Sequence, residues 1–554
     1  MRLKITLMAS LSGVLVLSAC APGGAGSGPA PDAAQVRSAE GAGSGACEPG
    51  KEVWRSPGPP TRGGTLVRAV SGFDHLDMTK PGLTALGATP QVYNSLIRFR
   101  GCFPSDTAMV PSLARAWEIS PDGRAWTFKL RDDVKWQNRP PVNGRSFTSA
   151  DVGKMIDLQK KEGVLRTYWI DVTNEQPDDH TVVLRTAEPQ ADLLGKVGAP
   201  ANVIMPQEIR EAYGDFKSVA VGTGAFMVKS FKPGQEVVLE PNPDYYENGD
   251  DGKRLPYLDE VRAIFFGDTA AELAALRAGR IDSTTTFGLR KLDADALRQS
   301  QPKMRPWEMR AFAPQALWFN LSRKPFDDVR VRRAAALAID VDDLIAVNRG
   351  GAGYNGYVPV SLTEYAWPHD KLRQKFKADP ERARRLLAEA GFPSGTPEFE
   401  LFAQSSGAEE AEVVQRHLEA VGLRSKITVI PGTFTATWQK RDYDLAWSGI
   451  GGVLFPGYWA GDLIRTGSPL NYMMFSDPEL DKLADAQARE MDPVRRKHLI
   501  DQIQDRLYDL MLYYPPINRA FYHFVSCRVR NHIQIQPGYN SPAVLYAWID
   551  TAGC

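Results

Sequence analysis

The side chains that most often do chemistry are dispersed in this sequence. Its histidines stand at no spacing typical of a metal site, and each is expected on the surface or in a satisfied core position. The chain has no H-E-x-x-H, no G-x-S-x-G and no Walker loop. A catalytic pair of carboxylates, as in glycosidases, stays an open alternative, because only the distance between the two groups in space would reveal it. We therefore expect a binding protein with no catalytic residues, metal or cofactor; a tethered surface hydrolase is the distant alternative. The seven histidines are His75, His180, His369, His417, His498, His523 and His532.

A glycine-containing stretch, Val221–Phe226, could be taken for a phosphate loop. It lacks a third glycine at dinucleotide spacing and has no G-K-[ST] ending. The pattern instead predicts a tight turn that enters a strand over Phe226–Phe231.

The stretch best suited to hold a solute is DYDLAWSGIGGVLFPGYW, residues Asp442–Trp459. Its glycines, Gly451 and Gly452, would let a ligand approach the backbone closely. Its aromatic residues offer flat apolar surfaces with a hydrogen-bond donor at the edge, which suit sugars, aromatic or modified peptides, or a chelate. Because strand tryptophans are usually core residues, we expect only two of five aromatic side chains to touch solute. The five, in this stretch and elsewhere, are Trp318, Trp438, Trp447, Tyr458 and Trp459.

The N-terminus is typical of an exported lipoprotein. Arg2 and Lys4 precede an apolar run, Ile5–Leu17, that is too short to span a membrane. Leu17-Ser18-Ala19-Cys20 resembles a lipobox in which Cys20 is lipidated; a plain signal peptide is the alternative. Residues 21–60 are rich in Gly, Ala, Ser and Pro, a composition that predicts a flexible tether of about 35 Å. We expect a protein held at the outer face of the cytoplasmic membrane by its lipid anchor.

The other four cysteines are even in number, which favours two disulfides in an exported chain. Three pairings are possible. The pairs nearest in sequence, Cys47–Cys102 and Cys527–Cys554, are the ones we expect.

Composition limits the possible partners and the fold. The 66 basic and 66 acidic residues give no net charge, which argues against nucleic-acid binding. A chain of 554 residues exceeds one core, so two or more domains are expected.

Local patterns predict both strands and capped helices. Within residues 113–158, Trp126, Phe128 and Leu130 alternate with polar residues after a Pro-Asp-Gly turn, as in a half-buried strand, and Thr148 and Asp151 have capping-box spacing. Further along, the sequence predicts a short helix over Gln91–Leu96, helices capped by Asp328, Asp340 and Asp379, a strand–helix–strand unit over Glu398–Ala403, Glu409–Val421 and Lys426–Ile430, and two helices in Pro478–Arg506.

The order of these residues resembles a known family. A-x-x-W-E-x-S-x-D-G-x-x-W-T-F-x-L-R-D-x-V-K-W, followed by T-x-A-D-V, is similar to the signature of the family-5 extracytoplasmic solute-binding proteins. These are the oligopeptide, dipeptide and nickel receptors of ABC importers. Gln137 stands where the family usually has histidine or aspartate. The resemblance extends from about Gly63 to about Asp550.

The resemblance implies an α/β, bilobal fold of the type II periplasmic binding proteins, with an extra subdomain in the first lobe and a two-crossing hinge. The chain changes lobe near Phe319 and Asn320 and returns near Pro515 and Pro516, which would make these the hinge residues. The expected parts are a signal peptide over 1–20, the tether over 21–60, lobe I over 61–317 with its subdomain over about 100–225, lobe II over 318–514 and a return to lobe I over 515–554.

The resemblance also implies which residues meet the solute. Tyr93 and Asn94 lie in the family's opening segment and could line the cleft or could pack the first helix. In peptide-binding members, the strand that corresponds to the one beginning at Asp444 leads to an acidic residue that pairs with the peptide's α-ammonium. In this sequence the residue nine positions after Asp444 is Val453. A buried ammonium without a counter-ion is costly, so free-N-terminal peptides would not be anchored in the usual way unless Asp462 substitutes.

The sequence therefore predicts an exported receptor, expected to be a monomer, that delivers a peptide or peptide-like solute to the permease subunits of an ABC transporter. An oligosaccharide or another non-peptide solute, including a metal chelate, is the alternative.

Overall fold

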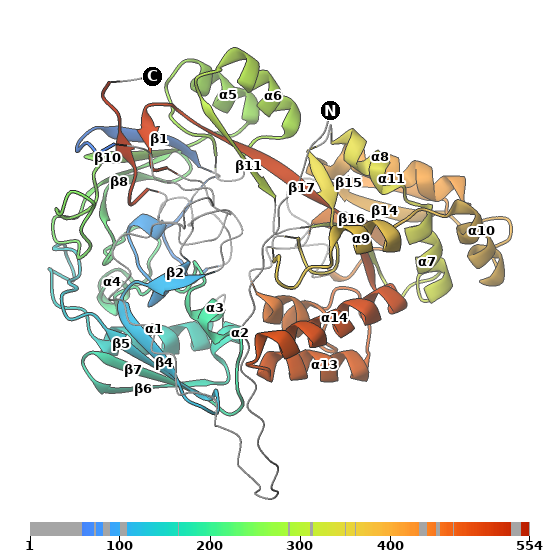
Figure 1. The fold of residues 1–554 in the computed structure, drawn as a ribbon, viewed down its shortest axis with the longest axis horizontal. Helices are drawn as coiled ribbons and strands as arrows, with labels where there is room; N and C mark the ends of the chain where they lie inside the picture. Colours follow the sequence, from blue (N-terminus) through green and yellow to red (C-terminus); the bar gives the residue numbers. More distant parts are fainter. Residues whose placement is uncertain are drawn as a thin grey trace, which may run out of the picture.

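The protein has two α/β lobes (Figure 1), in agreement with the predicted bilobal architecture. The computed structural model describes residues 58–70, 72, 74–80, 89–99, 108–163, 166–285, 288–310, 314–348, 351–360, 362–430, 440–449, 455–468, 470–532, 544–552 and 554. Cys20, Cys47, Cys102, Trp438 and Gly451–Val453 lie outside these residues.

Lobe I contains two four-stranded sheets. The first has the order β1-β10-β9-β8, with β1 parallel to β10 and the other neighbours antiparallel; the strands are β1 (Thr65–Val70), β8 (Phe226–Lys232), β9 (Glu236–Pro241) and β10 (Glu260–Phe265). The second is antiparallel in the order β4-β5-β7-β6; the strands are β4 (Ala114–Ile119), β5 (Ala125–Leu130), β6 (Val172–Asp178) and β7 (Thr181–Thr186).

Shorter elements complete lobe I around these sheets. They are η3 (Thr89–Gln91), β2 (Ile97–Phe99), β3 (Met109–Pro111), α1 (Ser149–Glu162), α2 (Arg166–Trp169), α3 (Leu193–Val197), α4 (Gln207–Tyr213), α5 (Thr269–Arg277), α6 (Lys291–Ser300), β18 (Val529–Arg530) and β19 (Trp548–Ile549). The short helix predicted over Gln91–Leu96 is wrong: the 3-10 turn η3 ends at Gln91, residues 92–96 form no helix, and the chain then enters β2, where Ile97 and Phe99 pair with β3.

The strand–turn–strand–helix prediction for the second sheet is confirmed. Trp126, Phe128 and Leu130 are buried on one face of β5. The carboxylate of Asp151 in the first turn of α1 accepts a hydrogen bond from the Thr148 backbone N–H at 3.0 Å. The same carboxylate accepts the indole N–H of Trp136 at 3.2 Å, so it fixes the start of α1 to the segment after β5.

Gln137, which departs from the family pattern, ties the second sheet to the glycine turn before β8. Its side chain accepts a hydrogen bond from the Gly222 N–H at 3.0 Å and donates to the Phe226 carbonyl at 2.7 Å. A Cβ at Gly222 would collide with the Val92 carbonyl, which explains the glycine. The turn leads into β8, as the sequence predicted.

A seven-stranded mixed sheet with the order β11-β17-β12-β16-β14-β15, in which β13 also pairs with β17, forms the centre of lobe II and extends into lobe I through β11 and the second half of β17. The predicted strand–helix–strand unit is confirmed, since β14 and β15 are parallel and α11 connects them. The strands are β11 (Arg305–Arg310), β12 (Gln315–Phe319), β13 (Ala352–Tyr354), β14 (Phe399–Gln404), β15 (Ser425–Ile430), β16 (Leu445–Gly449) and β17 (Tyr513–Val525).

Helices cover this sheet, and several begin at an aspartate. Asp328, Asp340 and Asp379 each accept a hydrogen bond from a backbone N–H in the first turn, as predicted. The elements are α7 (Val329–Ala338), α8 (Val341–Val347), α9 (His369–Lys375), α10 (Pro380–Glu389), η4 (Ser405–Gly407), α11 (Ala408–Ala420), η5 (Tyr458–Leu463), α13 (Pro478–Arg489) and α14 (Pro493–Leu510).

Strand β17 passes from one lobe to the other. Its first half pairs with β12, where Gln315 faces Ile517, and its second half pairs with β11, where Arg310 faces Ala520. The lobes are therefore joined along β17 near Asn518–Ala520 and by the chain between β11 and β12.

This crossing differs from the expected hinge residues. Phe319 and Asn320 are fully buried in lobe II, and the Asn320 amide donates to the Tyr443 carbonyl at 2.6 Å. Pro515 and Pro516 are buried within β17. The crossing is displaced from these residues because β12 and β17 pair with each other inside lobe II before they diverge.

The C-terminal end is fastened by the Cys527–Cys554 disulfide, one of the two expected pairs. Beside it β18 and β19 pair.

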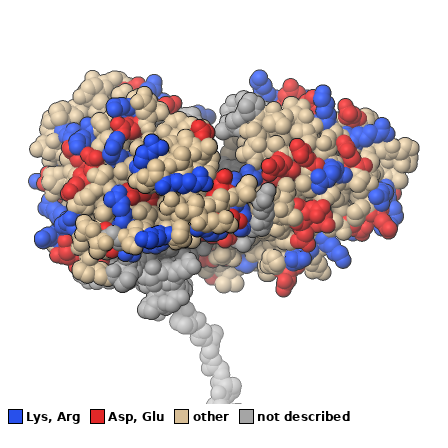
Figure 2. Space-filling view, turned by 90° about the horizontal axis from the view of Figure 1, so that it is seen from above, with Lys and Arg blue, Asp and Glu red and all other residues tan. Residues whose placement is uncertain are grey.

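Charged residues of both signs are mixed over the face seen in Figure 2, and the chain carries no net charge. In the part of the chain that the structure describes, no helix is long and apolar enough to cross a membrane.

Candidate functional site

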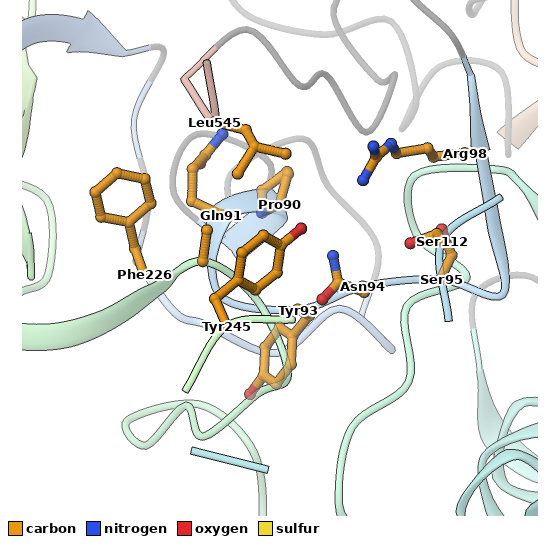
Figure 3. A pocket seen from close by; sticks show the side chains of 11 residues that line it. Pro90, Gln91, Tyr93, Asn94, Ser95, Arg98, Ser112, Phe226, Tyr245 and Leu545 are labelled. Atoms are coloured by element: carbon orange, nitrogen blue, oxygen red, sulfur yellow. The ribbon is translucent and has the colours of Figure 1, made fainter. Parts of the chain in front are cut away.

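Tyr93 and Asn94 line a small pocket in lobe I (Figure 3). The pocket has a volume of about 30 Å³, enough for a few waters at most. Its other lining residues are Pro90, Gln91, Ser95, Arg98, Ser112, Ala225, Phe226, Tyr245 and Leu545. The side chain of Asn94 points into the middle of this group, and its Oδ1 accepts a hydrogen bond from Thr223 at 3.0 Å.

The cation of this pocket is already neutralised. Arg98 makes a bidentate ion pair with Glu247, with distances of 2.6 and 3.0 Å. Tyr245 and Tyr546 also donate hydrogen bonds to Glu247 at 3.1 and 3.2 Å. Burial would raise the pKa of Glu247, but the charge and hydrogen bonds of Arg98 outweigh it and leave that pKa lowered. Arg98 is therefore not free to bind a solute carboxylate.

The Tyr93 ring borders the pocket, but its hydroxyl points away from the other lining side chains (Figure 3). Its ring is fully buried, and no described residue makes a hydrogen bond of good geometry with its hydroxyl. Burial raises the pKa of Tyr93, and the nearby Asp77 adds to the effect, so the hydroxyl keeps its proton at physiological pH.

The expected solute loop leaves lobe II and meets lobe I. Strand β16 ends at Gly449, and after the segment 450–454 the chain continues with Phe455 and Gly457. Phe455 is buried in the lobe I core and contacts the Tyr168 ring edge-to-face at 5.6 Å. A Cβ at Gly457 would collide with the Asp192 carboxylate of lobe I, so glycine is required for this approach.

A buried ion pair joins the two lobes at the same place. Arg496 of α14 contacts Asp192, which precedes α3, at 2.6 Å, and the two side chains are 7% and 6% exposed. The Ala191 N–H also donates to the Ala488 carbonyl of lobe II at 2.9 Å. In Figure 1 these elements meet opposite β17. We call Asp192, Phe455, Gly457 and Arg496 the interlobe contact.

A second buried ion pair lies at the crossing strand. Glu410 of α11 accepts two hydrogen bonds from Arg519 of β17, one of them from Nε at 2.7 Å. It also accepts the Trp447 indole N–H and the Asn348 amide, both at 2.8 Å. We call these four residues the Glu410 network.

Lobe I also reaches the Glu410 network. Arg290, directly before α6, donates to the Ser406 carbonyl at 2.7 Å and to Asn348 at 3.4 Å. The network therefore stabilises the joint between the lobes as well as lobe II.

Three tryptophans expected near solute are core residues. Trp318 is 1% exposed and donates to the Ser448 carbonyl at 3.0 Å, and its ring stacks on Tyr513 at 4.8 Å. Trp447 and Trp459 are fully buried, and Trp459 donates to Tyr513 at 2.8 Å. Each indole N–H is used inside lobe II, so the structure corrects the expectation for these three side chains. Tyr458 lies in η5.

Neither ion pair was predicted from the sequence, although a signal for each was present. Arg496 stands on a buried stripe of α14 with Ile500, Ile503 and Leu507. A charged residue in such a stripe requires a buried partner. Glu410 stands in the same way before Val414 and Leu418 in α11. The partner itself could not be found from spacing, because it lies far away in the chain.

Among the described residues, no group of three His, Cys, Asp or Glu side chains could hold a metal ion.

Comparison with known proteins agrees with this architecture. The di/tripeptide-binding protein 1 of Pseudomonas aeruginosa (strain UCBPP-PA14) is 26% identical over 514 residues, which covers 85% of this chain and 91% of that protein. The heme-binding protein A of Haemophilus influenzae is 25% identical over 501 residues, which covers 83% of this chain and 87% of that protein.

A solved structure shows the same fold. The periplasmic binding protein DppA from Helicobacter pylori, in complex with peptide STSA, superposes with a TM-score of 0.73 at 22% identity, over 89% of this chain and 99% of that one.

Residues 108–471 match the family model described as "bacterial extracellular solute-binding proteins, family 5 middle". That match spans more than half of the chain, so this protein belongs to the family-5 bacterial extracellular solute-binding proteins.

Proposed function

We propose that this protein encloses a peptide or peptide-like solute between its two lobes and delivers it to the membrane subunits of an ABC transporter. Its role is binding rather than catalysis, as in the other members of its family. It acts as a monomer, held outside the cytoplasmic membrane by a lipid on Cys20.

The interlobe contact is the observation that carries this proposal. In the sequence, Gly451, Gly452 and Val453 stand between Gly449, the end of β16 in lobe II, and Phe455, which is buried in lobe I. The solute contacts that we propose for these three residues follow from this position in the sequence. Tyr93 and Asn94 are the proposed partners from lobe I, and Tyr458 the proposed aromatic contact. Contacts that exist only when the lobes meet favour the closed form.

The peptide class is supported by the di/tripeptide-binding relative, which matches 85% of this chain. A second candidate is a non-peptide solute such as an oligosaccharide or a metal chelate. Two observations favour it: Val453 offers no carboxylate to a peptide ammonium, and a heme-binding relative matches nearly as much of the chain.

The test is to purify the protein without denaturation, release the bound compound and weigh it by mass spectrometry. A series of peptide masses supports the peptide class. A hexose-based mass or a single non-peptide mass supports the second candidate. If di- and tripeptides, oligosaccharides and chelates all fail to bind the emptied protein in calorimetry, the receptor proposal is wrong.

The anchor is tested separately. The Cys20→Ala variant should move from the membrane fraction to the soluble exported fraction, while solute binding is unchanged. Retention of this variant at the membrane would contradict lipid anchoring.

A further inference from the structure

The dipeptide Asn-Gly occurs three times in this chain, and the three copies lie in different surroundings. In such a dipeptide the backbone nitrogen of the glycine can attack the side-chain amide of the asparagine, because the glycine has no Cβ to shield it. The attack requires an asparagine side chain that can turn and a glycine N–H that is not engaged in a hydrogen bond. The three copies are Asn143-Gly144, Asn248-Gly249 and Asn355-Gly356.

The copy in lobe II is protected by burial. Asn355 is fully buried, and its side-chain N–H donates to the Gly356 carbonyl. Its Oδ1 accepts the Val360 N–H at 3.1 Å. The amide cannot turn toward the glycine nitrogen without losing both bonds, and each loss in a buried position costs stability. We therefore expect Asn355 to be inert while the protein is folded.

The second copy has an exposed asparagine, but its glycine is engaged. The Gly249 N–H donates to the Lys253 carbonyl at 2.8 Å, and the Gly249 carbonyl accepts the Gly252 N–H at 3.0 Å. A Cβ at Gly249 would collide with the Tyr257 hydroxyl, so this glycine is packed against a buried ring. Asn248 itself is exposed. Attack by the Gly249 nitrogen would first have to break the bond to Lys253.

The third copy has neither protection. Asn143 is exposed, and the Gly144 N–H makes no hydrogen bond within the described residues. The Asn143 side chain has one bond, an exposed one from Nδ2 to the Pro141 carbonyl at 3.2 Å. Both residues have positive φ, +54° and +73°, which explains why asparagine and glycine form this turn. The turn accounts for the residue types, but it leaves the attacking nitrogen free.

We propose that Asn143 is the site at which this protein deamidates spontaneously. The Gly144 nitrogen forms a bond to Cγ of Asn143 and gives up its proton, while the Cγ–Nδ2 bond breaks and Nδ2 leaves as ammonia. Water then opens the resulting five-membered succinimide at one of its two carbonyl carbons. Opening at Cγ gives an aspartate, and opening at the backbone carbonyl gives an isoaspartate, in which the main chain runs through Cβ.

The two products should differ in their effect on lobe I. Aspartate tolerates positive φ as asparagine does, so it should keep the turn. Isoaspartate lengthens the main chain by one atom and should disturb the bond from the Asn143 N–H to the Arg139 carbonyl, now 2.8 Å. It should also displace Arg145, whose guanidinium links Asp151 and Glu208 at 2.9 and 2.6 Å. The reaction does not depend on the solute proposed for the cleft.

The test is to incubate the full chain in mildly alkaline buffer and to quantify the three peptides by mass spectrometry after digestion. In the folded protein, Asn143 should react about two- to tenfold faster than Asn248, the factor that corresponds to one hydrogen bond of about 0.5–1.4 kcal/mol on the glycine N–H. Asn355 should not react. In urea the three rates should become similar, because the unfolded chain removes the protection of the other two copies.

The products are tested with the variant Asn143→Asp, which reproduces the aspartate form. Its thermal midpoint should equal that of the parent, whereas the midpoint of the incubated parent should fall in proportion to its isoaspartate content. Equal rates for Asn143 and Asn248 in the folded chain would overturn the proposal, and so would the same order and spacing of the three rates in urea. An unchanged midpoint at high isoaspartate content would overturn the effect inferred for the turn.

Discussion

Two buried arginine–carboxylate pairs lie at opposite ends of the boundary between the lobes. Glu410 meets Arg519 beside the crossing strand, where Trp447 and Asn348 also donate to the carboxylate. Asp192 meets Arg496 at the far end, where Gln487 accepts a hydrogen bond from Arg496 at 3.0 Å. The first pair lies where the chain is continuous through β17. The second joins segments of different lobes that are far apart in the chain.

The difference shows that the same chemistry can serve two purposes. Burial would raise the pKa of Glu410, yet the charge of Arg519 and the hydrogen bonds leave it lowered, so this carboxylate is well stabilised as an anion. The Glu410 network should therefore maintain the fold. The Asp192–Arg496 pair should instead set how readily the lobes close, because opening would expose both groups to water.

The largest effect is expected when Glu410 is removed. Glu410→Ala leaves Arg519 buried without its partner, which should cost about 3–5 kcal/mol of unfolding free energy. Urea unfolding followed by tryptophan fluorescence measures this loss. The exposed neighbour provides the control, and Glu409→Ala should change the free energy by less than about 0.5 kcal/mol. Equal stability of the two variants would remove the distinction between the ion pairs.

The second effect concerns closure. Asp192→Asn leaves Arg496 without its charge partner only in the closed form, so solute affinity should fall about 10- to 100-fold, or about 1.4–2.8 kcal/mol. Calorimetry with the released solute measures it. Asp179→Asn, at an exposed position of lobe I, should bind normally. A stability loss as large as that of Glu410→Ala, with unchanged affinity, would contradict this assignment.

A third buried carboxylate differs from both pairs because it has no guanidinium partner within the described residues. Glu272 of α5 is 4% exposed and accepts a hydrogen bond from the Thr285 N–H at 2.7 Å. Burial raises its pKa from 4.5 to about 7, and nearby Asp293 adds to the effect. The folded state thus holds a proton that the unfolded state has lost between these pH values, so the free energy of unfolding falls as the pH rises through that interval.

Glu272→Gln should remove this pH dependence. The variant and the parent should be equally stable below about pH 4.5, and the variant should be more stable by about 3 kcal/mol at pH 8. Thermal unfolding at both pH values measures the difference, with Glu211→Gln, on the exposed side of α4, as the control. A variant less stable than the parent at pH 8 would show that the carboxylate is charged and compensated.

The smallest effect tests whether the ammonium group of a peptide solute needs a carboxylate from the protein. Val453→Asp should strengthen the binding of free-amine dipeptides about tenfold, or about 1.4 kcal/mol, if this position faces the ammonium. N-acetylated dipeptides serve as the control and should gain nothing. Unchanged affinity for both would mean that the cleft does not place an ammonium near Val453.

Local structure was predictable wherever neighbouring residues determine it. Asp379 followed by Pro380 predicted the start of α10, and the alternation of Trp126 and Phe128 predicted β5, because caps and pleats depend on residues a few positions apart. The βαβ unit of lobe II followed from the same kind of pattern.

The candidate site was less predictable because it depends on contacts between distant segments. Which of the aromatic side chains are buried could not be read from local sequence, although strand tryptophans are usually core residues; Trp318, Trp447 and Trp459 all are. The pairing of Asp192 with Arg496 joins residues in different lobes and has no local signature. The position of the crossing was missed because β12 and β17 pair with each other before they diverge.

We expect the two lobes to close on a solute, with the Asp192–Arg496 pair contributing to closure. Small-angle X-ray scattering of the emptied protein, before and after addition of the released solute, measures this closure. The solute should reduce the radius of gyration of the parent, and Asp192→Asn should need a higher solute concentration for the same reduction. A radius of gyration that stays constant at saturating solute would show that the lobes do not close.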